Sequence, residues 1–371
     1  MSQTLPTFAI VSTDIRRDLV APVSYFTGLN VVHFYRRASY GDLAPDELGE
    51  GLVAYGSPLD LFRRILMARP DAVQGVEPFS IRLLPYLYAV FAAALLRRIP
   101  LIVVTLENRP LREKHGAVLS RLLRLALRPV LGHARLIIHL NEGSRRNVLS
   151  VGPFEGKLRR LMYGTWGVDL DEFNPRRDGR EPDFGAGPVL LFVGRLHVEK
   201  GVFDLLDAFR LVAEQLPEAR LVLVGDGPAR MEVQRIVTER AWTNRVITTG
   251  TIRNRDLPPY FRSSDVFVAP SVTTRKWEEQ VGMTNIQAMA CGVPVVSTRS
   301  GAIPEYVPDG EAGVLVPERD PEALARTVLR ILSDEELRRK MGATGRAYAE
   351  EHYDARKNVR EAESEILGLL E

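Results

Sequence analysis

Short apolar runs that end in glycine, proline or polar residues recur along the chain and alternate with longer stretches of helical periodicity. Strands that alternate with helices in this way are typical of a parallel sheet with helices on both faces. The first half has predicted strands at 7–12, 31–35, 72–75, 101–106, 134–140 and 158–163. The second half has predicted strands at 189–193, 220–224, 245–248, 265–269, 293–297 and 313–316. The sequence therefore predicts an α/β protein with two doubly wound sheets.

A chain of 371 residues is too long for one hydrophobic core of the usual size. Residues 164–187 are rich in glycine, proline and aspartate and have little periodicity, which is typical of a linker. We expect Rossmann-like domains at 1–180 and 181–350, and a final helical segment at 351–371. Two such domains usually face each other across a cleft, where small molecules bind. Within the first domain, a helix is predicted at 111–132 with a kink or break at Pro129.

Composition excludes several classes of protein. The formal net charge is +2, which gives no reason to expect nucleic-acid binding. Cys291 is the single cysteine, so a disulfide framework is excluded and a cytoplasmic location is expected. No signal peptide is evident, and the longest apolar run, 83–96, is shorter than the roughly 20 residues of a membrane span. None of the six histidines has the spacing of a metal site.

The stretch at 264–297 combines a buried strand, a polar loop, a helix that follows Gly282, and a second strand. In a parallel sheet the loop and the helix start lie at the carboxyl edge, where free backbone N–H groups favour an anion. Glu279 lies in this loop, and it could also be an ordinary acid that favours the positive end of the helix dipole. The stretch is therefore a candidate ligand site.

A second candidate is the segment GRLHVEKG at 194–201, between a strand and a helix. Arg195 and Lys200 would hold a phosphate with two cations and the helix N–H groups. The segment is neither a P-loop nor a GxGxxG motif. The alternative is a plain turn with exposed basic residues.

These segments occur in an order that resembles one family. The chain resembles retaining, nucleotide-sugar-dependent glycosyltransferases of the GT-B fold, family 4, also called glycosyl transferases group 1. The resemblance is carried by FVGRLHVEKG, LVLVGDGP, DVFVAPS and AMACGVPVVSTRSGAIPEYVPDGEAGVLV, and by GVDLDEFNP at the linker. The resemblance is strong over 167–316 and weak before residue 140. It implies an acceptor domain at 1–180, a nucleotide-sugar donor domain at 181–350, and a final helix that crosses back to the first domain.

The resemblance also implies roles for individual residues. Arg195 and Lys200 would grip the donor diphosphate and stabilise its developing charge, so that no metal or other cofactor is required. Glu279 would lie near the donor sugar. The remaining donor-binding candidates are Gly194, Ile252, Gly282, Met283, Thr284 and Gln287. Gln287 departs from the family, which has a glutamate there that accepts hydrogen bonds from the ribose hydroxyls; glutamine accepts them without charge.

The first half departs further from the family. Thr13 and Asp14 stand where a glycine-rich turn is usual, and Glu107 stands where many members have histidine. Glu107 is therefore a candidate catalytic residue that would bind a sugar hydroxyl or polarise the acceptor, or else a surface acid. Thr13, Asp14, Asn108 and Arg109 are candidate acceptor-binding residues.

Residues 112–135 contain five arginines and one lysine among regularly spaced leucines. A basic, leucine-rich helix can lie on anionic lipid, as in several members of the family. The alternative is a helix with one core face and one solvated basic face. If it docks on a membrane, the acceptor would be lipid-linked and the protein peripheral at the inner face.

The expected function is transfer of a hexose from a nucleotide diphosphate sugar to the hydroxyl of a glycan, a glycolipid or a small molecule. Two alternatives remain open at this stage. The same fold hosts nucleotide-sugar epimerases, and a chain of this kind can also bind the nucleotide sugar without catalysis.

Overall fold

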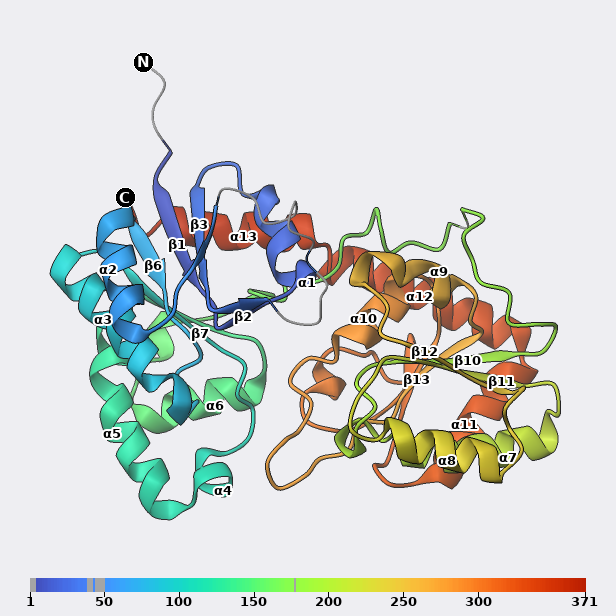
Figure 1. The fold of residues 1–371 in the computed structure, drawn as a ribbon. Helices are drawn as coiled ribbons and strands as arrows, with labels where there is room; N and C mark the ends of the chain where they lie inside the picture. The colour runs from blue at the N-terminus through green and yellow to red at the C-terminus, as the bar shows by residue number, and fades with distance from the viewer. Residues whose placement is uncertain (1–4, 39–42, 44–50, 177) are drawn as a thin grey trace. The chain divides into compact units, whose positions relative to one another are not determined.

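The computed structural model describes residues 5–38, 43, 51–176 and 178–371. The chain forms two compact units. Unit 1 consists of residues 1–166 together with 355–371, and unit 2 consists of residues 167–354. Each unit is built on its own parallel sheet, as the alternation of strands and helices predicted (Figure 1).

The sheet of unit 1 has seven strands, all paired in parallel, in the order β5-β3-β1-β6-β7-β8-β9. Their bounds are β1 Thr7–Val11, β3 Asn30–Tyr35, β5 Leu52–Ala54, β6 Ala72–Gln74, β7 Leu101–Thr105, β8 Leu136–His139 and β9 Leu158–Arg160. The chain builds outward from β1 through β3 to β5, and then returns to place β6 beside β1. The order of strands therefore reverses between β1 and β6, and in open sheets this is where ligands bind.

Helices cover the sheet of unit 1, and their bounds are α1 Arg17–Val20, α2 Pro58–Ala68, α3 Leu84–Arg97, α4 Leu111–His115, α5 Ala117–His133, α6 Glu142–Val151 and α13 Ala355–Leu367. The Ser57 side chain caps α2 by accepting from the N–H of Asp60 at 3.2 Å. Asn141 and Ser144 form a reciprocal capping box at the start of α6. The core includes Phe34, Phe79 and Leu87, all almost fully buried.

The last helix, α13, belongs to unit 1 although it follows the whole of unit 2 in the sequence. In Figure 1 it is the red helix beside β1 and β3. The buried Glu363 carboxylate accepts from the N–H groups of Thr27 and Gly28 at 2.9 and 2.6 Å. The Asn358 amide donates to the carbonyl of Trp166 at 2.9 Å. These bonds tie α13 to the first part of the chain.

The sheet of unit 2 has six strands in the order β12-β11-β10-β13-β14-β15, again all parallel. Their bounds are β10 Val189–Val193, β11 Arg220–Val224, β12 Val246–Gly250, β13 Val266–Ala269, β14 Val295–Thr298 and β15 Gly313–Val316. The helices are α7 Val202–Gln215, α8 Arg230–Glu239, α9 Pro258–Arg262, α10 Met283–Ala290, α11 Pro321–Ser333 and α12 Glu335–His352. Here the order of strands reverses between β10 and β13.

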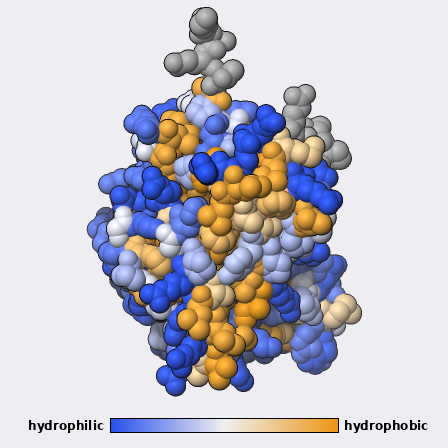
Figure 2. Space-filling model, turned by 90° about the vertical axis from the view of Figure 1, so that its left-hand side faces the viewer, coloured by the Kyte–Doolittle hydropathy of each residue, from blue (hydrophilic) through white to orange (hydrophobic). Residues whose placement is uncertain are grey.

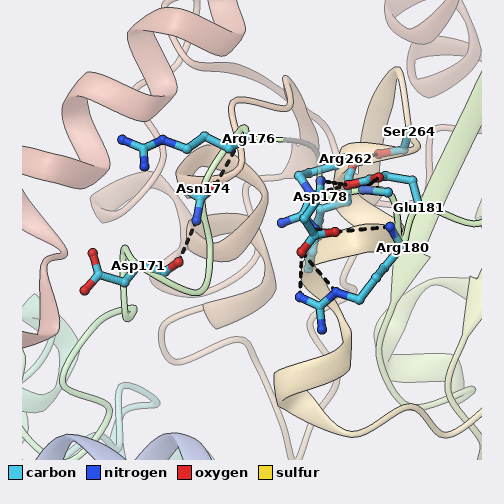
Figure 3. Close-up of polar contacts among 10 residues, drawn as sticks. Asp171, Asn174, Arg176, Asp178, Arg180, Glu181, Arg262 and Ser264 are labelled. Atoms are coloured by element: carbon cyan, nitrogen blue, oxygen red, sulfur yellow. Dashed lines mark hydrogen bonds and ion pairs between the residues drawn. The ribbon is translucent and has the colours of Figure 1, made fainter.

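The segment after Trp166 is packed against the rest of unit 2. The Arg262 guanidinium on α9, which is 3% exposed, pairs with Asp178 at 2.9 Å and with Glu181 at 2.7 Å (Figure 3). The Glu181 carboxylate also accepts from the N–H groups of Asp178 and Gly179 at 3.2 and 3.0 Å. Because a buried guanidinium requires paired anions, Arg262 fixes this part of the segment that the sequence indicated as a linker.

Two details differ from the sequence-based prediction. The helix predicted at 111–132 is interrupted at Gly116, whose φ of +80° lies outside the helical region, and it continues past Pro129 to His133. The predicted break at Pro129 is therefore wrong. The helix α6, which occupies ten residues between β8 and β9, was also not predicted.

Candidate functional site

Three glycines follow or end neighbouring strands of unit 2 and allow their loops to pack closely. Gly194 follows β10, Gly225 follows β11, and Gly250 ends β12. Gly225 has φ of +138°, and a Cβ atom there would lie 1.9 Å from the carbonyl oxygen of Gly194. Only glycine fits this approach. At the carboxyl ends of β10, β11 and β12, these glycines therefore leave the backbone without side chains, close to the point where the order of strands reverses.

Lys200 and Glu279 meet at that reversal, although they are 79 residues apart in the sequence. Lys200 Nζ lies 2.5 Å from Glu279 Oε2. The Ser271 hydroxyl donates to the same oxygen at 3.0 Å, and the Lys200 ammonium lies 4.7 Å from the centre of the Trp277 ring. Both charged side chains keep a small exposed surface, 22% for Lys200 and 13% for Glu279. The site therefore holds a cation and a carboxylate within reach of a ligand.

The backbone around Lys200 fixes this geometry. Lys200 ends a short 3₁₀ turn, Val198–Lys200, and Gly201 follows with φ of +67°. A Cβ atom at Gly201 would lie 1.8 Å from the carbonyl oxygen of Pro270, just after β13. The Val272 N–H also donates to the carbonyl of Glu199 at 2.8 Å. The loops after β10 and β13 are thus joined through their backbones, which holds Lys200 opposite Glu279.

Arg195 is exposed, and it forms no hydrogen bond or ion pair with any residue in the described part of the chain. It follows Gly194 directly after β10, at the same edge of the sheet as Lys200. A second cation is therefore available to a ligand at this edge.

The helix α10 begins beside Glu279. Gly282 precedes it with φ of +78°, and the half-buried Met283 and Thr284 form its first turn. The first N–H groups of such a helix are not used within the helix and attract an anion. Gln287 is buried one turn later, with 4% of its surface exposed. Ile252 lies apart from these residues, after β12 at the edge of the sheet.

In unit 1 the structure separates the predicted site residues into two groups. Glu107, Asn108 and Arg109 follow β7 and are buried, each less than 10% exposed. Glu107 forms an ion pair with Lys114. The amide of Asn147 on α6 donates to the carbonyls of Glu107 and Arg109 at 2.7 and 2.8 Å. These contacts hold the loop after β7 to α4 and α6.

Thr13 and Asp14 instead line a cavity of about 240 Å³ in unit 1. The cavity lies where β1 and β6 end side by side, at the reversal of strand order. Its wall includes Glu77, which was not among the site residues predicted from the sequence. The Glu77 carboxylate accepts from Thr105 Oγ1 at 2.9 Å and from the N–H groups of Leu106 and Phe79 at 2.8 and 3.1 Å.

Burial dominates the electrostatics of this cavity. It raises the pKa of Glu77 to about 7, against the three hydrogen bonds that favour the ionised form, and the nearby Glu107 raises that pKa further. Burial also lowers the pKa of His33 to about 4. Glu77 could have been found from the sequence as a polar residue that closely follows β6. This strand lies at the point where the order of strands reverses.

Residues 177–348 match the family of glycosyl transferases group 1. This match contains Arg195, Lys200, Glu279 and the start of α10.

Two curated relatives are similar over part of their length. A GDP-mannose-dependent alpha-(1-6)-phosphatidylinositol monomannoside mannosyltransferase of Mycolicibacterium smegmatis is 32% identical over 240 residues, which are 63% of this chain and 62% of the relative. Sulfoquinovosyl transferase SQD2 of Arabidopsis thaliana is 32% identical over 202 residues, which are 52% of this chain and 37% of the relative. The chain thus spans less than two thirds of the length of either relative.

Solved structures extend the likeness of fold to both units. The crystal structure of Anabaena HepE in complex with UDP and glucose has a TM-score of 0.77 and 18% sequence identity, and the match covers 96% of this chain and 98% of HepE. Sucrose-phosphate synthase from Thermosynechococcus elongatus has a TM-score of 0.69 and 20% identity, over 98% of this chain and 99% of that one. The chain therefore has the GT-B fold with two Rossmann-like domains, as predicted.

Two features are absent from the described residues. No group of three or more histidine, cysteine, aspartate or glutamate side chains among them could hold a metal ion. Within the same residues, no helix is long and apolar enough to cross a membrane.

Proposed function

We propose that the chain is a retaining glycosyltransferase that moves a hexose from a nucleotide diphosphate sugar to an acceptor hydroxyl. The observation that carries the proposal is the Lys200–Glu279 pair at the reversal of strand order in unit 2, within the segment that matches glycosyl transferases group 1. Relatives whose names include GDP-mannose, and a solved structure that contains UDP and glucose, make a sugar nucleotide the natural donor.

In this proposal each charged group at the site has a separate role. Arg195 and Lys200 neutralise the diphosphate as the bond from its oxygen to the anomeric carbon breaks, which is the step where negative charge develops. The first N–H groups of α10 bind the distal phosphate. Glu279 accepts hydrogen bonds from hydroxyls of the sugar. The departing phosphate oxygen takes the proton of the acceptor hydroxyl, which attacks from the same face, and no metal is needed.

Calorimetric binding of a panel of UDP-, GDP-, ADP- and TDP-sugars, with and without EDTA, tests the proposal. We expect one of them to bind in the micromolar range regardless of EDTA, and Arg195→Ala to weaken that binding at least ten-fold by removing a phosphate contact. The exposed Arg326 on α11 offers a matched control, since Arg326→Ala removes an equal charge elsewhere in unit 2.

The wild-type protein and the same sugar nucleotides also distinguish the transferase from the two alternative functions. Turnover of the donor without any acceptor would favour an epimerase, and binding without either turnover or transfer would favour an inactive nucleotide-sugar-binding protein. If no sugar nucleotide binds, the proposal is wrong.

We further propose that α5 rests on the anionic inner face of a membrane and that the acceptor is lipid-linked, with the protein otherwise in the cytoplasm. Four apolar side chains of α5 are strongly exposed: Val118 at 76%, Leu119 at 44%, Leu122 at 56% and Leu125 at 60%. The exposed Arg121 and Arg128 lie on the same helix. Figure 2 shows hydrophobic side chains gathered in a band on the face that carries the helices of unit 1. Exposed leucines between basic residues suit an anionic lipid surface.

Co-sedimentation with vesicles that contain phosphatidylserine tests this surface. We expect the wild type to sediment at low salt, and Leu122→Glu to reduce binding about ten-fold, because it places a charge where an acyl chain would lie. Leu96→Glu is the matched control, since Leu96 on α3 is 67% exposed but lies outside α5. Equal loss in both variants, or no sedimentation of the wild type, would contradict the membrane proposal.

A further inference from the structure

Trp277 is an aromatic residue beside the charged pair of unit 2. Its ring centre lies 4.7 Å from Lys200 Nζ, and Glu279, which pairs with Lys200, comes two residues after it in the sequence. Trp277 is half-buried, whereas the other two tryptophans of the chain, Trp166 and Trp242, are only 1% and 8% exposed. Part of the indole ring is therefore accessible to a ligand that reaches Lys200.

A tight turn fixes the direction of Trp277 within its loop. The N–H of Thr274 donates to the carbonyl of Trp277 at 2.8 Å. The Thr274 hydroxyl accepts from the N–H groups of Lys276 and Trp277 at 3.3 and 3.1 Å. These bonds use the backbone of Trp277, and its indole N–H forms no hydrogen bond with any residue in the described part of the chain. This N–H is thus a donor that a ligand can use.

Glu318 holds the base of the same loop from the turn after β15. Its carboxylate accepts from the N–H and from the hydroxyl of Thr273, both at 2.7 Å. The neighbouring Arg319 donates to the carbonyl of Thr273 at 2.8 Å, and its φ of +58° lies in the left-handed region. Such strain persists where the surrounding contacts impose it. The hydroxyl of the buried Ser300 also lies 3.0 Å from that of Thr273. The loop is therefore fixed in place just before it reaches Trp277.

The position beside Lys200 suits the sugar of a sugar nucleotide. The sugar is bonded directly to the diphosphate, so a diphosphate that contacts Lys200 brings the sugar close to the Trp277 ring. A tryptophan side chain combines an apolar body with one N–H donor. A sugar ring has apolar C–H groups and hydroxyls, and it can use both. A nucleoside diphosphate has no ring at this end and would leave the indole N–H unpaired.

We propose that Trp277 recognises the sugar of the donor, with its indole N–H donating to a sugar hydroxyl, and that Glu318 is a positioning residue for its loop. The inference rests on the proposed transferase function and deepens it. Arg195 and Lys200 would bind the diphosphate of the donor and of the product alike. Trp277 would distinguish the donor from the nucleoside diphosphate that remains after transfer.

Calorimetric titration of the full chain with the sugar nucleotide that binds the wild type, and then with the matching nucleoside diphosphate, tests the role of Trp277. Trp277→Phe keeps an aromatic ring and removes the N–H. We expect it to weaken binding of the sugar nucleotide about five-fold, as for the loss of one hydrogen bond, and to change binding of the nucleoside diphosphate by less than about two-fold. Trp242→Phe is the matched control, because Trp242 packs on Phe209 in the core of unit 2 and should leave both affinities unchanged.

The same titrations followed by tryptophan fluorescence test the role of Glu318. Because Trp277 is the most exposed tryptophan, the sugar nucleotide should change the emission of the wild type more than the nucleoside diphosphate does. Glu318→Ala removes both bonds to Thr273 and should lose this difference and about five-fold in affinity for the sugar nucleotide. Glu318→Gln, whose amide oxygen can still accept one of the two bonds, should restore part of it. Glu322→Ala is the control, since Glu322 is an exposed acid at the start of α11.

The assignment of Trp277 is wrong if Trp277→Phe binds the sugar nucleotide as tightly as the wild type, or if it weakens both ligands equally, as a purely structural role would. The positioning role of Glu318 is wrong if Glu318→Ala behaves like Glu322→Ala. If no sugar nucleotide binds the wild type, the proposed transferase fails together with this inference. A sugar nucleotide that binds the wild type and Trp277→Phe equally removes the inference alone.

Discussion

Replacing Lys200 by alanine is expected to lower the rate constant for sugar transfer by about 100- to 1,000-fold. This is the range measured when one preorganised group that stabilises developing charge is removed, and it corresponds to roughly 3–4 kcal/mol of transition-state stabilisation. Lys200 is held in place by Gly201, by its pair with Glu279 and by the Trp277 ring, so its charge is already oriented before the donor binds. The measurement is kcat and KM with the donor identified by calorimetry.

Lys276→Ala is the control for this experiment. Lys276 is an exposed cation in the same loop as Glu279, and its removal should leave kcat within about two-fold of the wild type, since exposed charges contribute little. Removing Lys200 also removes its ion pair with Glu279, so thermal melting must show that the variant is folded at the assay temperature. A variant with raised KM and unchanged kcat would mean that Lys200 binds the ground state alone. Unchanged kcat and KM would remove it from the site.

The second large effect is a loss of stability with rising pH that depends on Glu77. Its pKa rises from the ordinary 4.5 to about 7 in the folded protein. Between these values the folded state keeps a proton that the unfolded state has lost, so the free energy of unfolding falls as pH rises through this window. The penalty is absent below pH 4.5 and complete above pH 7. At 1.36 kcal/mol per pKa unit it amounts to about 3 kcal/mol.

Urea unfolding at a series of pH values between 4 and 8 measures this effect as the difference between the wild type and Glu77→Gln. The difference is needed because His33 acts in the opposite direction. Its pKa is lowered to about 4, so its contribution to the free energy of unfolding rises with pH between about 4 and 6.5. The difference should slope across the window, whereas Glu155→Gln, at an exposed carboxylate, should run parallel to the wild type. Parallel curves for Glu77→Gln and the wild type would show that Glu77 has an ordinary pKa.

The fold and part of the site could be predicted because their signals are local. Each strand is an apolar run with a clear end, and each of the loops that carry Lys200 and Glu279 lies between a strand and a helix. Their meeting needs only the reversal of strand order, which a doubly wound sheet supplies.

The acceptor side could not be predicted in the same way. Glu107 follows a strand, but the sequence did not reveal that Lys114, seven residues later, pairs with it or that Asn147 on the unpredicted α6 binds its loop. Glu77 follows a three-residue strand, and its carboxylate is buried against the end of β7, where Thr105 and Leu106, 28 and 29 residues further along the sequence, donate to it. Propensity and periodicity carry no information on either contact. The break at Gly116 was missed because proline is the stronger local signal of a helix end.

The position of α13 has a consequence for the order in which the chain folds during its synthesis. Unit 2 is a continuous segment, 167–354, inserted between the two parts of unit 1. A ribosome therefore releases all of unit 2 before it releases Asn358 and Glu363, which hold Trp166, Thr27 and Gly28. Because domains generally fold as units during synthesis, we expect unit 2 to complete its fold before unit 1 gains its contacts with α13.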